Sequence, residues 1–410
     1  MNRFEETKKR YASVGVDVEK ALERLAMIPV SMHCWQGDDV HGFLSDGELS
    51  GGIQTTGNYP YRARNFKELI ADIDFAFSLI PGKKRINLHA IYAVLKEKKD
   101  VDELTTEDFR PWIDWAKEKG VGIDFNPTLF SHPMVKNGLT LSSPDENVRK
   151  FWIRHVKACR KIAADIGKEQ GSPCLNNLWI PDGLKDVPGN RLAPRMRLKE
   201  SLDEIYAVKY PTEYIVDSVE SKVFGIGVES YTDGSSEFYM NYAAMNGLCC
   251  LLDNGHYHPT EVVSDKIPSM LAFFDKVALH VTRGVRWDSD HVVLLEDELK
   301  EIAKEIVRNN ADQRVLIGLD YFDASINRTS AWITGMRNMQ KALLWALLMP
   351  NEETTKLQDE ARFTELMYLN EKMKTFPFGD VWEEYLKRQN VEEDYFEAVE
   401  KYEKEISDRK

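Results

Sequence analysis

The sequence predicts an α/β fold, a (β/α)₈ TIM barrel with N-terminal helices and a C-terminal helical extension. Eight short runs of β-branched and other apolar residues recur along the chain, and segments with helical periodicity separate them. No GxGxxG loop follows the first run, whereas a doubly wound open sheet usually has such a loop and fewer strands. The repeated alternation of strand and helix therefore favours a closed barrel.

Each predicted strand is a short run in which apolar residues predominate. The runs are residues 28–35, 85–92, 120–130, 176–183, 215–224, 248–256, 277–287 and 315–323. Barrel enzymes place their catalytic groups at the carboxyl ends of the strands. The polar residues near the ends of these runs are therefore the first candidates for a functional site.

The segments between the strands space their apolar residues by three or four, which is typical of amphipathic helices. They are residues 66–80, 105–120, 147–167, 198–210, 236–247, 264–277 and 296–310. Gly120, Gly167 and Gly247 are predicted C-terminal caps of three of these helices. Residues 330–350 are predicted to form a strongly apolar helix after the last strand.

The chain is predicted to have one catalytic domain and one extension. Residues 1–350 form the barrel, and the first 27 of them form one or two helices that cap its bottom. Residues 351–410 are too polar for a core of their own, so we expect helices that pack on the barrel or on a neighbouring subunit. The Gly-rich segment 36–65 is long for a connection within a domain and is a candidate lid.

The composition limits the classes of partner. The 410 residues carry a formal net charge of −13, which argues against nucleic acid and anionic membranes because both need a basic footprint. A small neutral ligand or a cation fits better. The sequence has neither the apolar core of a signal peptide nor an apolar run long enough to span a membrane. We therefore expect a cytoplasmic protein whose five cysteines are reduced.

Residues able to bind a metal or a substrate lie near the ends of all eight runs. In chain order they are His33, His89, Asp124, Asn126, Trp179, Asp182, Glu220, Lys222, Asp253, His256, His280, Asp288, Asp290 and Asp320. Asp288 and Asp290 are two residues apart, so their side chains point the same way if that stretch is extended. A turn at Gly255 would let Asp253 and His256 converge on one point.

A barrel would bring five of the carboxylates in this set together: Glu220, Asp253, Asp288, Asp290 and Asp320. Each close pair would repel by about 4 kcal/mol at ~4 Å with an effective dielectric constant near ~20. A marginally stable fold does not tolerate so many such pairs unaided, so either several pKa values rise far or cations compensate. Two divalent ions together with Lys222 would balance the five negative charges.

The histidines in this set define the kind of metal site. His256 and His280 are suitable neutral ligands, and mixed carboxylate and imidazole ligands favour Mn²⁺, Co²⁺, Zn²⁺ or Mg²⁺ over softer metals. A lone buried histidine or aspartate is more often a hydrogen-bonded core residue, but seven such residues on four consecutive strands favour a metal site. For His33 and His132 the structural and the functional interpretations are equally supported.

Nine segments in the same order together resemble the L-rhamnose isomerase family, and the match covers nearly the whole chain. They are SMHCWQGDDVHGF, GNYPYRARN, INLHAIY, DFNPTLFSHP, WIPDGLKD, VESKVFGIGVESY, DNGHYHPTE, HVTRGVRWDSDHVV and DYFDASINR. The resemblance implies a manganese-dependent aldose–ketose isomerase that converts L-rhamnose to L-rhamnulose. It also implies a homotetramer of barrels that binds a small sugar.

The resemblance assigns the metal ligands to two ions. One ion is held by the positions that match Glu220, Asp253, His280 and Asp320. The other is held by those that match His256, Asp288 and Asp290, with Asp253 as a candidate bridge. Lys222 matches a lysine that contacts the substrate near its reacting oxygens.

The expected reaction is a metal-assisted hydride shift from C2 to C1 of the open-chain sugar. The candidate catalytic residues are Lys222, Asp320 and His89, and His89 would open the sugar ring or bind a ring hydroxyl. Trp179 and Phe130, together with Trp35, are candidate apolar walls that exclude water. Proton transfer through an enediol is the alternative route.

Two other kinds of function compete with the isomerase. A metal-dependent barrel epimerase or hydrolase acting on another small sugar would also gather acids and histidines. A non-catalytic sugar-binding barrel would be expected to have lost some ligands, whereas all seven positions are present.

Overall fold

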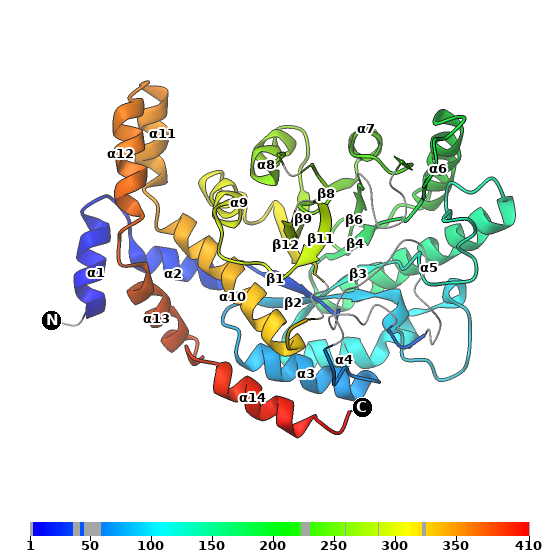
Figure 1. Cartoon of the computed structure of the whole chain (residues 1–410), viewed down its shortest axis with the longest axis horizontal. Coiled ribbons are helices and arrows are strands. Elements are labelled where there is room, and N and C mark those ends of the chain that lie inside the picture. The colour runs from blue at the N-terminus through cyan, green and yellow to red at the C-terminus, as the bar shows by residue number, and fades with distance from the viewer. Residues whose placement is uncertain are drawn as a thin grey trace.

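The chain forms a closed barrel of eight parallel strands surrounded by helices, which confirms the predicted (β/α)₈ fold (Figure 1). Around the barrel the strands follow the order β1-β12-β9-β8-β6-β4-β3-β2. Their bounds are β1 (Val30–His33), β2 (Lys84–His89), β3 (Gly122–Asn126), β4 (Cys174–Leu178), β6 (Ile215–Glu220), β8 (Cys249–Asp253), β9 (Val277–Val281) and β12 (Val315–Leu319).

The computed structural model describes residues 3–35, 42–44, 59–222, 230–258, 260–285, 287–321 and 325–409. Of residues 285 and 287–289 it describes the backbone alone. The candidate lid at 36–65 therefore lies largely outside the described residues.

Each predicted helix overlaps an observed one between the strands or after the last strand, although the helix predicted at 198–210 is observed at Leu192–Ile205. The observed helices are α3 (Phe66–Ser78), α4 (Arg110–Lys119), α5 (Glu146–Gln170), α6 (Leu192–Ile205), α7 (Ser236–Asn246), α8 (Val263–Leu271), α9 (Asp297–Arg308) and α10 (Arg328–Leu347). The predicted helix at 264–277 is too long at its end. There the chain turns after Leu271, and Phe273, which the helical spacing would bury, is 85% exposed.

Two of the three predicted glycine caps are confirmed. Gly120 and Gly247 end α4 and α7 in the left-handed conformation, with φ of 67° and 65°. The prediction for Gly167 is wrong, because α5 continues to Gln170 and is capped by Gly171. A β-carbon at Gly167 would lie 1.7 Å from the carbonyl oxygen of Tyr214, so this glycine allows close backbone approach instead.

Alternate residues of each strand point into the barrel and form layers along its axis. A lower layer is a separate apolar cluster of Leu175, Val216, Cys249, Leu251 and Ala278. The polar residues at the upper ends of the strands lie above this layer. The cluster thus separates the two ends of the barrel interior.

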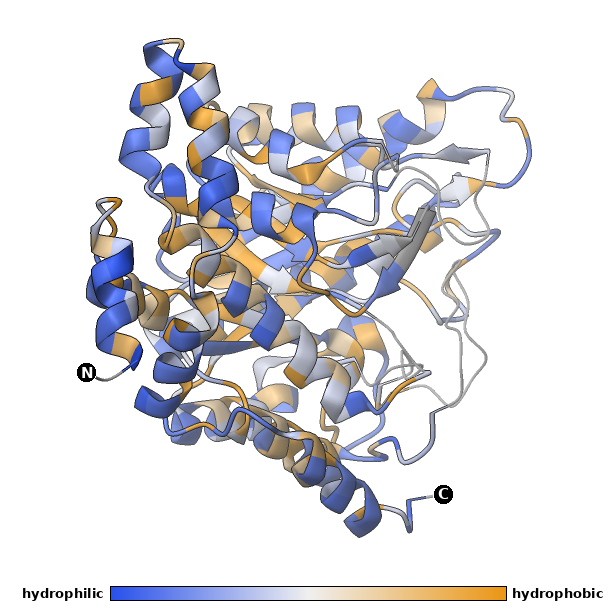
Figure 2. Ribbon diagram, turned by 60° about the vertical axis from the view of Figure 1, so that its left-hand side comes forward, coloured by the Kyte–Doolittle hydropathy of each residue, from blue (hydrophilic) through white to orange (hydrophobic). Residues whose placement is uncertain are grey.

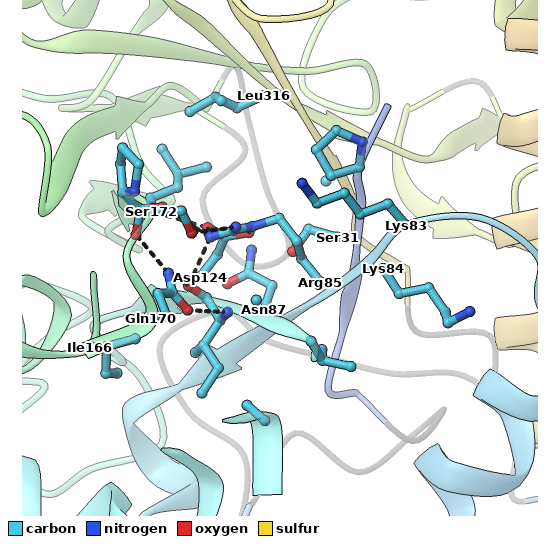
Figure 3. Close-up of a pocket in the computed structure, with 18 of the residues that line it drawn as sticks. Ser31, Lys83, Lys84, Arg85, Asn87, Asp124, Ile166, Gln170, Ser172 and Leu316 are labelled. Atoms are coloured by element: carbon cyan, nitrogen blue, oxygen red, sulfur yellow. Dashed lines mark hydrogen bonds and ion pairs between the residues drawn. The ribbon is translucent and has the colours of Figure 1, made fainter. Parts of the chain in front are cut away.

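A cavity of about 570 Å³ opens at the amino-terminal ends of the strands, at the opposite end from the candidate site (Figure 3). Arg85 on β2 binds Asp124 on β3 through two hydrogen bonds, from Nη2 at 2.8 Å and from Nε at 2.9 Å. The same guanidinium donates to the carbonyl oxygens of Ile123 and Pro173. Asp124, a strand-end candidate in the sequence, is therefore part of a buried ion pair in this lower region.

Among the described residues, two short antiparallel pairs of strands lie outside the barrel. β10 (Arg283–Val285) and β11 (Trp287–His291) pair antiparallel directly after β9, and β5 (Gly183–Leu184) pairs with β7 (Tyr231–Thr232). The run at 277–287 was predicted as one strand, but β9 leaves the barrel at Val281. Asp288 and Asp290 consequently lie on β11, beyond the barrel wall.

The described residues also form six helices before and after the barrel. They are α1 (Arg3–Ala12), α2 (Val18–Met27), α11 (Asn351–Asp359), α12 (Phe363–Met373), α13 (Phe378–Arg388) and α14 (Phe396–Glu405). α2, α13 and α14 contact α10, and α13 also contacts α1. Arg337 on α10 donates to the carbonyl oxygens of Leu79, Glu392 and Glu393, which ties the C-terminal segment to the barrel.

The helices at the surface are amphipathic. Both hydrophilic and hydrophobic residues recur along each of them (Figure 2). α11 and α12 form a hairpin that projects from the rest of the molecule (Figure 1). Within the described residues, no helix combines the length and the apolarity needed to cross a bilayer.

Candidate metal centre and active site

The candidate site is built from residues at the carboxyl ends of five strands. Glu220 ends β6, Asp253 ends β8, and His280 is the fourth residue of β9. Asp320 follows β12 directly, and His33 ends β1. Parallel strands of a closed barrel bring these positions to the same mouth. The fold therefore gathers the charged groups before any ligand is considered.

His280 faces three carboxylates. Its Nδ1 lies 3.3 Å from Oε2 of Glu220, 3.4 Å from Oδ2 of Asp320 and 4.0 Å from Oδ2 of Asp253. His256 approaches the other oxygen of Glu220, with Nδ1 at 3.2 Å from Oε1. Glu220 thus contacts both imidazoles.

Two groups of ligand-type atoms are close enough together to hold an ion. In each group the atoms all lie within 4.8 Å of one another. One group is Glu220, Asp253 and His256, and the other is His33, His280 and Asp320. The pairing differs from the one implied by the resemblance, which places His280 with Glu220 and Asp253. The contacts of Glu220 with both histidines make the two groups one continuous cluster.

The remaining two predicted ligands come from β11. The side chain of Asp288 lies outside the described residues. Oδ1 of Asp290 would lie 3.0 Å from a β-carbon on Gly255, and Oδ1 of Asp253 would lie 3.2 Å from it. The turn after β8 therefore brings Asp290 towards Asp253, and the absence of a side chain on Gly255 leaves room for both carboxylates.

Burial makes the charges of this cluster interdependent. Burial raises the pKa of Asp253 to about 7 and that of Asp320 to about 6, and the charge of Glu220 adds to both shifts. For His280, burial alone would lower the pKa, but Glu220, Asp320 and Asp253 outweigh it and raise the pKa to about 9. For Glu220, burial would raise the pKa, but His280 and His256 outweigh it and keep the pKa well below its usual value.

The donor set fits a divalent cation. His280 Nδ1 is buried and, among the described residues, has no hydrogen-bond partner, although three carboxylates surround it. A cation ligated by that nitrogen and by the carboxylates would satisfy all of them. The described ligand atoms are nitrogen and oxygen only, which suits a borderline or hard ion rather than a soft one.

An aromatic wall borders this cluster on one side. The rings of Trp35 and His89 are 4.1 Å apart, Phe130 lies 6.2 Å from each of them, and Trp179 lies 6.1 Å from Phe130. Nζ of Lys222 lies 4.5 Å from the centre of the Trp179 ring. The structure thus brings all four predicted substrate-binding residues, His89, Phe130, Trp179 and Lys222, onto one wall.

A hydrogen bond connects this wall to the charged cluster. Trp35 Nε1 donates to Oδ1 of Asp320 at 2.9 Å. His89 is buried, and burial together with the charge of His280 keeps its pKa well below the usual value, so its imidazole is neutral at pH ~7. A neutral imidazole beside an aromatic surface can accept a proton from a substrate hydroxyl.

Sequence reasoning missed one residue of the site and left another undecided. Asn177 on β4 donates Nδ2 to Oε2 of Glu220 at 2.5 Å and accepts from Oγ of Ser218 at 2.8 Å. Asn177 stands two residues before Trp179, so strand alternation could have placed it on the inner face. Nε2 of His33 lies 3.2 Å from Nε2 of His280, which favours the functional interpretation of His33.

Two other strand-end candidates do not join the cluster. Asp124 pairs with Arg85 at the lower end of the barrel. Asp182 accepts hydrogen bonds from the backbone N–H groups of Thr140 and Ser142, each at 2.8 Å, which fixes a loop. Both carboxylates are satisfied where they lie and have structural roles.

The fold and this cluster define a (β/α)₈-barrel enzyme of the metal-dependent class. The family model described as L-rhamnose isomerase (RhaA) matches residues 1–410. An L-rhamnose isomerase of Listeria innocua serovar 6a is 53% identical over 407 residues, covering 98% of this chain and 97% of the relative. One of Salmonella paratyphi B is 53% identical over 406 residues, with the same coverage.

The chain belongs to the L-rhamnose isomerase family, and it is an aldose–ketose isomerase. This membership does not favour the barrel epimerase, the hydrolase or the non-catalytic sugar-binding barrel. The nine segments that resemble this family all lie within the residues that the family model matches.

Proposed function

We propose that this protein interconverts L-rhamnose and L-rhamnulose by a metal-assisted hydride shift from C2 to C1. The observation that carries the proposal is the buried cluster in which His280 Nδ1 faces Glu220, Asp253 and Asp320. The relatives at 53% identity are named for the same sugar. Such a cluster at the mouth of a barrel suits a substrate with two adjacent oxygens to be held.

Two divalent ions are the proposed cofactors, with Mn²⁺ as the native ion and Zn²⁺, Co²⁺ or Mg²⁺ as substitutes. Glu220, Asp253, His280 and Asp320 would hold one ion, and His256, Asp288 and Asp290 would hold the other. When bound, the ions would supply Lewis-acid polarisation of two adjacent substrate oxygens.

The residues of the chain itself have separable roles in the reaction. Breaking the C2–H bond and forming the C1–H bond moves a hydride, while the proton of O2 is transferred, in net terms, to O1. Lys222 would stabilise the negative charge that develops on O1, because its ammonium group is buried beside Trp179. Trp35, Phe130 and Trp179 would keep water from the migrating hydride.

His89 and Asp320 have supporting roles in the proposal. His89 would accept the anomeric hydroxyl proton during ring opening, since its imidazole is neutral and lies against Trp35. Asp320 would orient the substrate oxygens, and its Oδ1 is itself fixed by Trp35 Nε1.

The isotope content of the product distinguishes the hydride shift from the enediol route. When L-rhamnose reacts in heavy water, we expect the hydrogen of C2 to appear at C1 of the ketose with less than about one exchange in ten turnovers, because the aromatic wall excludes solvent. Nuclear magnetic resonance of the product measures this transfer. Extensive deuterium at C1 would instead establish proton transfer through an enediol.

Metal binding should depend on pH in a defined direction. Asp253 and Asp320 have raised pKa values of about 7 and about 6, so the metal-free protein is more stable when they are protonated and loses stability as pH rises through these values. His280, raised to about 9, loses its stabilising charge at still higher pH. A bound ion compensates the ionised carboxylates.

We therefore expect the increase in Tm on adding Mn²⁺ to grow between about pH 5 and pH 8. Differential scanning calorimetry of the chelated and the Mn²⁺-loaded protein measures it at each pH. An increase of equal size at both ends of this range would contradict the assignment of these carboxylates as ligands.

The proposal extends to assembly and location. A homotetramer is supported by the apolar side chains that α12 leaves exposed, Phe363, Met367 and Tyr368 at 61%, 63% and 66%. A cytoplasmic location belongs to the same proposal, in keeping with five buried cysteines that are all free thiols.

A panel of aldoses tests the proposed substrate. The Mn²⁺-loaded protein is incubated with L-rhamnose and with aldoses that differ at single carbons, and ketose formation is measured. We expect the highest kcat/KM with L-rhamnose. A markedly higher value with another aldose would reassign the substrate within the same reaction class.

A further inference from the structure

Buried hydrogen bonds link two asparagines of the barrel interior to His280. Asn126 on β3 donates Nδ2 to the carbonyl oxygen of Leu88 at 3.2 Å and also to Oδ1 of Asn87. Nδ2 of Asn87 lies 2.9 Å from Nε2 of His33, and that nitrogen lies 3.2 Å from Nε2 of His280. All four side chains are almost completely buried.

The carbonyl group of Leu88 fixes the direction of these hydrogen bonds. A carbonyl oxygen only accepts, so the Asn126 amide must present its NH₂ group to Leu88 and, with its second hydrogen, to Oδ1 of Asn87. Asn87 is then left with its own NH₂ group facing His33. His33 Nε2 must therefore be the acceptor.

The protonation of the two imidazoles follows from that direction. A neutral imidazole has one N–H and one lone pair, so His33 carries its proton on Nδ1, which lies 3.4 Å from Oδ1 of Asp320. Because His33 Nε2 presents a lone pair, the nitrogen of His280 that faces it must be N–H. When His280 gives up its second proton to bind an ion, its lone pair is therefore on Nδ1, the atom that faces Glu220, Asp253 and Asp320.

We propose that His33 is a positioning residue that holds His280 in the tautomer able to ligate a metal through Nδ1, and that Asn87 and Asn126 hold His33 in turn. The inference rests on the proposed two-metal isomerase and deepens it. It also separates His33 from the ligands, since the only lone pair of its neutral ring faces Asn87 Nδ2 and His280 Nε2 and not the carboxylates.

The packing around His280 restricts rotation of its ring. A β-carbon on Gly318 would lie 3.2 Å from Cδ2 of His280, so the glycine on β12 provides the space for the ring. The His33 and His280 rings meet edge to face at 88°, with centres 4.7 Å apart. The ring of His280 is thus held between β12 and His33, with Nδ1 directed at the carboxylates.

Mn²⁺ affinity measured by isothermal titration calorimetry on the metal-free full chain tests the role of His33. His33→Leu removes the acceptor and should weaken the tighter Mn²⁺ site by about 10- to 100-fold, as expected for loss of a group that orients a ligand. His33→Gln can place an amide oxygen near the position of Nε2 and should keep the affinity within tenfold of wild type. Equal weakening in both variants would overturn the proposal.

Asn87→Asp provides a second test that preserves volume. A carboxylate at this position draws a proton onto His33 Nε2, so the nitrogen of His280 facing it becomes the acceptor and Nδ1 receives the proton. The proposal predicts Mn²⁺ binding at least tenfold weaker. Simple charge attraction predicts the opposite, because the variant adds a negative charge near the ions, and unchanged or tighter binding would overturn the proposal.

His155→Gln is the matched control. His155 is also fully buried, but it bonds the carbonyl oxygen of Val101 and the N–H of Thr128 instead of the cluster. We expect wild-type Mn²⁺ affinity in this variant, and thermal melting checks folding in all four. If the wild type itself binds no Mn²⁺ or forms no ketose, the proposed function fails; if it does both and His33→Leu binds Mn²⁺ as wild type does, only this inference fails.

Discussion

Glu220→Gln is expected to lower kcat for ketose formation from L-rhamnose by about 10³-fold or more. Glu220 contacts His256 through one oxygen and His280 through the other, at 3.2 and 3.3 Å, so it serves both groups of ligand atoms. The amide keeps the shape but removes the negative charge and turns a donor towards one imidazole. Steady-state kinetics and the number of Mn²⁺ ions bound per chain measure the effect.

Glu298→Gln is the control for this substitution. Glu298 is a partly buried glutamate that accepts hydrogen bonds from Ser264 and lies on α9, away from the cluster. It should leave kcat and the bound Mn²⁺ unchanged. A Glu220→Gln protein that retains a tenth of wild-type kcat would show that the cluster around His280 is not the reaction centre.

Lys222→Met should lower kcat by about 10²- to 10³-fold while leaving Mn²⁺ affinity close to wild type. Methionine preserves most of the apolar contact with Trp179 but removes the ammonium group that lies 4.5 Å from the ring centre. KM should change much less than kcat, because the charge is needed most when O1 becomes negative.

Lys84→Met tests whether the loss of another partly buried lysine also lowers kcat. Lys84 donates Nζ to the carbonyl oxygens of Ile80 and Gly82 at the opposite end of the barrel. We expect wild-type kcat in this variant. Near-normal kcat in Lys222→Met would remove the role assigned to Lys222.

Much of the fold could be predicted from the sequence because the strands repeat a simple pattern. Every predicted run overlaps one observed barrel strand, and the catalytic-type residues stand near the ends of these runs. Glu220, Asp253, His280 and Asp320 come together because parallel strands in a closed barrel share one mouth, which requires no knowledge of individual contacts.

Other features depend on contacts between residues far apart in the sequence. Position 167 inside α5 requires a glycine because the backbone of Tyr214 passes close to it. The sequence around Gly167 gives no sign of that contact. The departure of β10 and β11 from the barrel depends on their antiparallel pairing, which the alternation of residues at 277–287 does not reveal.

The role of His33 also depends on contacts between distant residues and could not be predicted from the sequence. Its position at a strand end could be predicted, but the direction of its hydrogen bond depends on Asn87, Asn126 and the carbonyl group of Leu88. These residues come from three strands. Only the register of β1, β2 and β3 places their polar atoms within hydrogen-bonding distance.

Ketose formation from L-rhamnose, measured while Mn²⁺ is returned to exhaustively chelated protein, tests the central claim most directly. We expect no activity after chelation and full recovery as Mn²⁺ approaches two ions per chain, because the buried carboxylates around His280 need a compensating cation. Activity that survives complete removal of divalent ions would contradict the two-metal isomerase.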